Sequence, residues 1–231
     1  MATLVLIRHG QASYGEADYD RLSERGRAQA GALGPALAAM TLDAWFHGPL
    51  RRQRETAELA RAATPALPAP GVLDELAEYP AFEMLQHLIP RLVAEDPKFA
   101  QLTSAPTPRL LDEAFHTVLA RWGRDDWQVD GVERVGAFVD RVRRGFERAI
   151  AACGRGGRVA VVTSAGPIGV AVGLVFALPP ERAVRTSVVV RNASISELKL
   201  RTAGFAWQPE QVSLLTFNGT AHLPPELVTE R

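Results

Sequence analysis

Cysteine is almost absent from this chain of 231 residues, in which Cys153 stands alone. A single thiol cannot form an intrachain disulfide, so a disulfide framework and a cysteine-based metal cluster are both excluded. Net charge is absent as well, because 26 basic residues balance 26 acidic ones. Without a net field the chain is not drawn to nucleic acid or to an anionic membrane, and we expect neither as a partner.

The first residues lack the pattern of a secretory signal, because no basic segment precedes the short run 2–7 and Arg8 interrupts it too soon. The uncharged run 159–180 is long enough to raise a membrane span as an alternative. However, Thr-Ser-Ala-Gly-Pro at 163–167 divides this run into a short strand, a turn and an apolar helix. We therefore expect a cytoplasmic protein with a buried core.

Short apolar runs alternate with segments of helical periodicity. A helix is predicted after the N-cap residue Ser23, another at 52–63, and the period is helical throughout from Tyr79 to Ala152. The last two predicted strands are joined by a connection that contains Gly204. All the predicted strands are 4–7, 44–46, 159–163, 194–200 and 212–217.

This alternation predicts an α/β fold, a three-layer α/β/α sandwich with a mostly parallel sheet. We expect the helical block at about 79–152 to be an insertion over the active-site edge of the sheet, within a single domain that spans 1–231. The apolar content of 47% is enough for one substantial core.

Arg8 and His9 follow directly after the first predicted strand. Ligands of open α/β sheets collect at the carboxyl ends of the strands. The arginine offers a planar fork of donors for a phosphate, and a neutral imidazole can attack phosphorus. The alternative for an isolated pair is structural: Arg8 leaves the strand for solvent and His9 caps or packs the next turn.

Further motifs favour phosphoryl chemistry. Arg8-His9-Gly10 resembles the signature of the histidine phosphatase superfamily, which includes the cofactor-dependent phosphoglycerate mutases. Residues 48–57 resemble the family's Ser-Pro-Leu-x-Arg-Ala-x-Gln-Thr-Ala, with Gly48 in place of serine. The family's Leu-Ser/Thr-x-x-Gly-x-x-Gln-Ala pattern, at the N-terminus of a helix, resembles the residues Leu22, Ser23, Gly26, Gln29 and Ala30. The resemblance implies that His9 is the nucleophile, that Arg8 and Arg52 hold the phosphoryl oxygens, and that neither a metal ion nor a cofactor takes part.

The family also uses a carboxyl group as general acid, in a Leu-x-Glu context, and Leu76-Ala77-Glu78 fits it best. Such an acid supplies a proton to a poor leaving alkoxide. Glu75 in a competing register and Glu83 are the alternatives, and a solvated surface role is possible for each of the three.

The fourth motif departs from the family pattern. The strand 159–163 and the residues after it resemble the family's Val-Ser/Thr-His-Gly-Gly-x-Ile, but Ser164 stands at the position of the second histidine. The resemblance makes Ser164 a candidate phosphate ligand. A serine keeps one donor but is shorter and carries no positive charge, so the loss could cost on the order of 10² to 10³ in rate. A serine-hydrolase nucleophile is rejected, because the first glycine of Gly-x-Ser-x-Gly is missing.

We therefore expect a metal-independent phosphatase that hydrolyses a small phosphomonoester through a phosphohistidine on His9. One alternative is a phosphotransferase of the phosphoglycerate mutase type, which the motifs do not separate from a phosphatase. Another is a phosphate-ester binding or regulatory protein in which Ser164 has impaired catalysis. The patterns assign neither the physiological substrate nor the oligomeric state.

Overall fold

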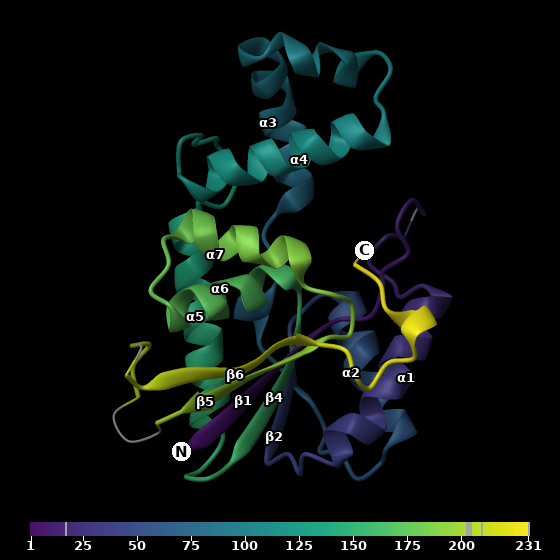
Figure 1. Cartoon of the computed structure of the whole chain (residues 1–231), viewed down its shortest axis with the longest axis vertical. Coiled ribbons are helices and arrows are strands. Elements are labelled where there is room, and N and C mark those ends of the chain that lie inside the picture. The colour runs from purple at the N-terminus through teal and green to yellow at the C-terminus, as the bar shows by residue number, and fades with distance from the viewer. Residues whose placement is uncertain (17, 202–204, 209, 231) are drawn as a thin grey trace.

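The computed structural model describes residues 1–16, 18–201, 205–208 and 210–230. Six strands form one sheet in the order β3-β2-β4-β1-β5-β6 (Figure 1). Their bounds are β1 Ala2–Arg8, β2 Ala44–His47, β3 Gly71–Val72, β4 Arg158–Thr163, β5 Ile195–Leu200 and β6 Val212–Gly219. Gly204, in the predicted connection between the last two strands, lies outside the described residues.

The sheet is mostly parallel, as the alternation of strands and helices predicts. β1, β2, β3 and β4 pair in parallel, whereas β5 runs antiparallel to both β1 and β6. β1 lies at the centre, where Arg8 is in register with Thr163 of β4. The carboxyl ends of these two neighbouring strands therefore meet at one edge of the sheet.

Helices cover both faces of the sheet and give the three layers. Leu4 and Leu6 of β1 join one buried cluster, and Val5 and Ile7 join the cluster on the opposite face, as the alternation of side chains in a strand requires. Both clusters are apolar. The helices are α1 Glu24–Ala38, α2 Arg51–Ala63, α3 Ala81–Glu95, α4 Pro108–Gly123, α5 Val135–Ala151, α6 Ala165–Val175 and α7 Pro180–Thr186.

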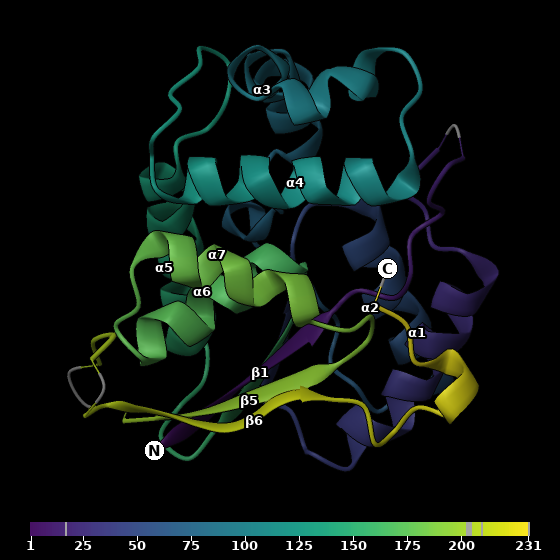
Figure 2. The same ribbon diagram turned by 45° about the horizontal axis from the view of Figure 1, so that its top comes forward.

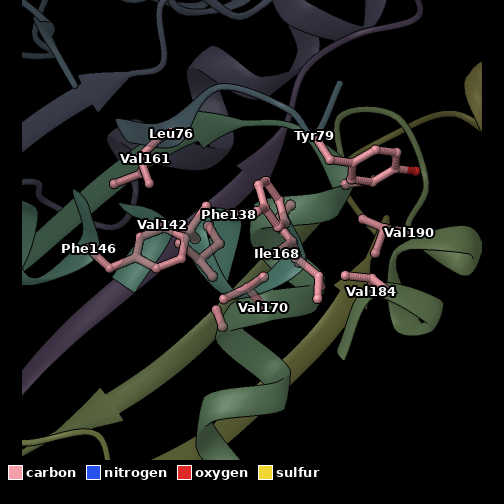
Figure 3. Close-up of a cluster of buried hydrophobic side chains, with 14 of the residues drawn as sticks. Leu76, Tyr79, Phe138, Val142, Phe146, Val161, Ile168, Val170, Val184 and Val190 are labelled. Carbon is pink, nitrogen blue, oxygen red and sulfur yellow. The ribbon is translucent and has the colours of Figure 1, made fainter. Parts of the chain in front are cut away.

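The helical block after Tyr79 consists of α3, α4 and α5. Figures 1 and 2 show α3 and α4 at the end of the molecule towards which β1 points, while α5 runs alongside the sheet. α4 also packs against α7. A short 3₁₀ helix, Pro97–Thr103, connects α3 to α4. Tyr79 and Phe138 of α5 meet edge to face in the apolar cluster of Figure 3, with ring centroids 5.9 Å apart.

Several boundaries differ from the sequence prediction. The segment 163–167 is not a separate turn, because α6 begins at Ala165 directly after Ser164. α7 and the two-residue strand β3 were not predicted, since both are too short to show a period. Ser23 is the N-cap of α1 as expected, and its hydroxyl accepts a hydrogen bond from the Gly26 N–H at 3.1 Å. No helix within the described residues is long and apolar enough to cross a membrane.

Candidate active site

His9 lies immediately beyond the carboxyl end of β1. Its backbone N–H donates to the Thr163 carbonyl at 2.9 Å, so His9 and Ser164 extend from neighbouring parallel strands. The Gly10 N–H donates to the Thr56 hydroxyl at 3.0 Å, and this hydroxyl donates to the Arg52 carbonyl at 2.7 Å. The segment that contains His9 is thereby tied to the first turns of α2.

Hydrogen bonds define the state of the His9 ring, which is only 4% exposed. Nδ1 lies 2.7 Å from the Gly10 carbonyl, which can only accept, so Nδ1 carries the proton. Nε2 then accepts from Arg52 Nε at 3.0 Å. Burial, helped by the positive charges of Arg52 and Arg8, places the pKa of His9 well below its ordinary value. The imidazole is therefore neutral, with its lone pair on Nε2.

Arg52 lies in the first turn of α2 and is 8% exposed. Besides its bond to His9, it pairs through Nη1 with Asp20, and its guanidinium lies 5.5 Å from the centre of the Tyr19 ring. A second oxygen of Asp20 accepts the Arg51 N–H at 2.8 Å. The segment around Asp20 therefore lies against the cation that the motifs assign to phosphate binding.

Arg8 is the second cation beside His9. Its Nη1 donates to the carbonyls of Val190 and Glu230, the latter at 2.9 Å. Its Nε is buried without a hydrogen-bond partner among the described residues. An unpaired buried donor costs about 1 to 3 kcal/mol, and a phosphoryl oxygen is the kind of acceptor that relieves this cost.

The Glu78 carboxyl group lies at the N-terminus of α6. Its Oε1 accepts from the N–H groups of Gly166 and Tyr79, each at 3.0 Å. Burial raises the pKa of Glu78, against the opposing effects of Arg52 and these two hydrogen bonds. A carboxyl group of raised pKa keeps its proton to higher pH, which suits a general acid.

The two alternative acids lie elsewhere. Glu75 forms an ion pair with Arg148 of α5. Burial alone would raise the pKa of Glu75, but a backbone hydrogen bond and Arg148 outweigh it and lower the pKa. Glu83 is exposed in the first turn of α3. Of the three candidate acids, Glu78 alone contacts the N-terminus of α6 and lies close enough to Arg52 and Arg8 for their charges to affect its pKa.

Ser164 is fully buried between β4 and α6. Its hydroxyl accepts a hydrogen bond from Gln53 Nε2 at 2.8 Å. Because no surface of Ser164 is open even to water, a phosphoryl oxygen would reach it only if the surrounding wall moved. The role of Ser164 in phosphate binding stays a prediction.

Sequence reasoning missed two residues that contact the predicted site. Asp20 pairs with Arg52, and Gln53 bonds Ser164. Gln53 lies inside the matched motif 48–57, and Asp20 lies two residues before Leu22, where the other motif begins. Neither position indicated its partner. Arg51 and Arg54, in the same basic run, are exposed: Arg51 pairs with Asp18 and Glu55, and Arg54 pairs with Glu58.

A family model described as the histidine phosphatase superfamily (branch 1) matches the chain over residues 4–124 and 98–211. No curated protein sequence matches the chain.

Solved structures match its fold. The structure of a mycobacterial glucosyl-3-phosphoglycerate phosphatase with inorganic phosphate is 22% identical, with a TM-score of 0.65 over 96% of this chain and 99% of that one. A phosphoserine phosphatase from Entamoeba histolytica, in complex with 3-phosphoglyceric acid, is 18% identical, with a TM-score of 0.63 over 97% and 100% of the two chains. A putative α-ribazole-5′-phosphate phosphatase from Escherichia coli is 20% identical, with a TM-score of 0.62 over 95% and 98%.

Proposed function

Because this chain belongs to the histidine phosphatase superfamily, we propose that it is a phosphatase that hydrolyses a small phosphomonoester through a phosphohistidine on His9. The observation that carries the proposal is the neutral His9 ring, whose Nε2 lone pair accepts from Arg52 Nε and whose pKa is lowered by burial and by the charges of Arg52 and Arg8. Phosphatase names among proteins of similar fold agree with it. No metal ion or cofactor is part of the proposed reaction.

In the first step, the phosphoryl oxygens replace His9 as the partner of Arg52 Nε and so release the Nε2 lone pair. Nε2 attacks phosphorus, an N–P bond forms, and the bond from phosphorus to the ester oxygen breaks. The departing oxygen takes the proton of the Glu78 carboxyl group. A correctly placed acid contributes about 10² to 10⁴ in rate to such a step.

In the second step, the Glu78 carboxylate takes a proton from a water molecule. The water oxygen attacks phosphorus, the N–P bond breaks, and its electron pair returns to Nε2 of His9. Inorganic phosphate leaves, and Glu78 is protonated again. Arg8 and Arg52 balance the negative charge of the phosphoryl group throughout both steps.

The proposal is tested by phosphate release from an aryl phosphate in the presence of a chelator. We expect turnover by the wild type and its loss in His9→Ala. His116→Ala is the matched control, because His116 is a half-exposed histidine on α4 that pairs with Asp112. Equal turnover by His9→Ala and the wild type would refute the assignment.

Two further measurements separate the alternatives. A mutase would interconvert phosphoglycerates with negligible release of phosphate. A binding protein would show heat of binding for phosphate esters in calorimetry and no turnover across a panel of phosphomonoesters. Either outcome would replace the phosphatase proposal.

A further inference from the structure

Gln53 is a fully buried polar side chain in the first turn of α2, next to Arg52. Its Oε1 accepts the Leu50 N–H at 3.0 Å. Its Nε2 donates to the Leu76 carbonyl at 3.2 Å and to the Ser164 hydroxyl at 2.8 Å. One amide thus joins the start of α2, which carries Arg52, to the segment before Glu78 and to Ser164 at the end of β4.

The Leu76 carbonyl is the most important of these three contacts, because it lies two residues before Glu78. It accepts a second hydrogen bond, from the Thr163 hydroxyl at 2.8 Å. These two hydrogen bonds therefore hold the segment that leads to Glu78 against α2 and β4. From the other side Arg141 of α5 donates to the Glu75 and Ala77 carbonyls, each at 2.8 Å. Both sides together fix the path of the chain that leads to the Glu78 carboxyl group.

The packing around Gln53 leaves no room for a larger neighbour. A Cβ atom on Gly48 would lie 2.3 Å from Gln53 Oε1 and 2.7 Å from the Leu76 carbonyl oxygen. Contacts below 3.0 Å are essentially never seen for Cβ atoms, so glycine at 48 is required by the position of this amide. The position of Gln53 therefore accounts for glycine at 48, one departure from the family motifs, and the same amide bonds Ser164, another departure.

We propose that Gln53 is a positioning residue, which holds the Glu78 segment and Ser164 against the helix that carries Arg52. Without its amide the Leu76 carbonyl keeps only the bond from Thr163, and the Ser164 hydroxyl loses its donor. The proton of Glu78 is then no longer held in line with the departing oxygen. The inference rests on the proposed function, since it assigns to Gln53 an effect on proton transfer.

The substitution Gln53→Met tests this, because methionine has a similar length and makes none of the three hydrogen bonds. A nitrophenolate leaves without a proton, whereas an alkoxide needs one, so the two substrates separate the acid step from the rest of catalysis. We expect kcat/KM for a simple alkyl phosphate to fall by about 10², the cost of a misplacement of roughly 1 Å. For p-nitrophenyl phosphate we expect a fall of less than about 10-fold, so the ratio of the two values changes.

Gln29→Met is the matched control. Gln29 is also fully buried, in α1. Its Oε1 accepts the Gln11 N–H at 2.7 Å, and its Nε2 donates to the Leu227 carbonyl and the Thr229 hydroxyl, so it makes none of its three bonds to the Glu78 segment. It is expected to change both substrates by the same factor. Thr163→Val, which removes the other donor to the Leu76 carbonyl, is a second variant in case Gln53→Met does not fold, and it should shift the ratio in the same direction.

Wild-type turnover with an unchanged ratio in the folded Gln53→Met or Thr163→Val variant would overturn the inference and leave the proposed function intact. A ratio that changes equally in Gln29→Met would also overturn it. Absence of turnover in the wild type, or His9→Ala as active as the wild type, would refute the proposed function and this inference with it.

Discussion

Gly166 offers a direct way to displace the proposed acid. A Cβ atom at this position would lie 2.0 Å from Oε1 of Glu78. Ordinary contact begins near 3.4 Å, so in Gly166→Ala the carboxyl group must retreat by roughly 1.4 Å. A misplacement of this size costs about 10² in rate when it affects a reacting group. The substitution removes no ionisable group from the site, so it tests the position of the acid separately from its chemistry.

The assay is kcat/KM for an alkyl phosphate, measured beside thermal unfolding. We expect a loss of about 10² in Gly166→Ala, close to the effect of Glu78→Gln, since a general acid contributes about 10² to 10⁴.

Gly136→Ala is the matched control for this substitution. Gly136 is the second residue of α5, as Gly166 is of α6, and a Cβ atom there meets nothing within 4 Å. The control should keep full activity and gain up to about 1 kcal/mol in stability. Full activity of Gly166→Ala on the alkyl substrate would refute the placement of Glu78 as the acid.

Three further predictions concern the other residues of the site. Arg52→Ala should lower kcat/KM by about 10- to 100-fold for each lost bond to phosphate, because such bonds contribute about 1.5 to 3 kcal/mol. Arg51→Ala removes only an exposed ion pair and should change kcat/KM by less than about twofold. Equal effects of the two substitutions would contradict the assignment of Arg52 to phosphate binding. The rate should be highest between the lowered pKa of His9, above which Nε2 carries no proton, and the raised pKa of Glu78, below which the acid keeps its proton. It should fall as pH rises through the pKa of Glu78, and a pH–rate profile of Glu78→Gln that keeps this fall would contradict the account. Ser164→His should lower the free energy of unfolding by about 1 to 3 kcal/mol, because the fully buried position has no room for an imidazole. Denaturant unfolding measures this change. Higher activity at unchanged stability would contradict the prediction.

The central strand and the first catalytic candidates could be predicted because they depend on local patterns. The apolar run that stops at Arg8 predicts a strand end at Arg8 and His9, and this prediction does not depend on the rest of the chain. The N-cap at Ser23 is similarly local, since its partner Gly26 is three residues away. The short strand β3 and the helix α7 carry too few residues for a period, and only pairing and packing create them.

The contacts that Gln53, Gly48 and Asp20 make around the site could not be predicted from the sequence. The bond from Gln53 to Ser164 joins positions 111 residues apart, and no periodicity encodes it. The reason for glycine at 48 is likewise visible only once the Gln53 amide and the Leu76 carbonyl are in place. The ion pair between Asp20 and Arg52 is a third contact of this kind. Local patterns therefore predict candidate reactive groups, whereas the residues that position them emerge from the tertiary contacts.

The central claim is that His9 becomes phosphorylated during turnover, and trapping this intermediate tests it most directly. The wild type is mixed with a radiolabelled phosphomonoester and quenched in alkaline denaturant, and its peptides are mapped. The account predicts a label that is stable to alkali, lost in acid and confined to the peptide that contains His9, with none in His9→Ala. Turnover in the wild type without any label on His9, together with full activity of His9→Ala, would contradict it.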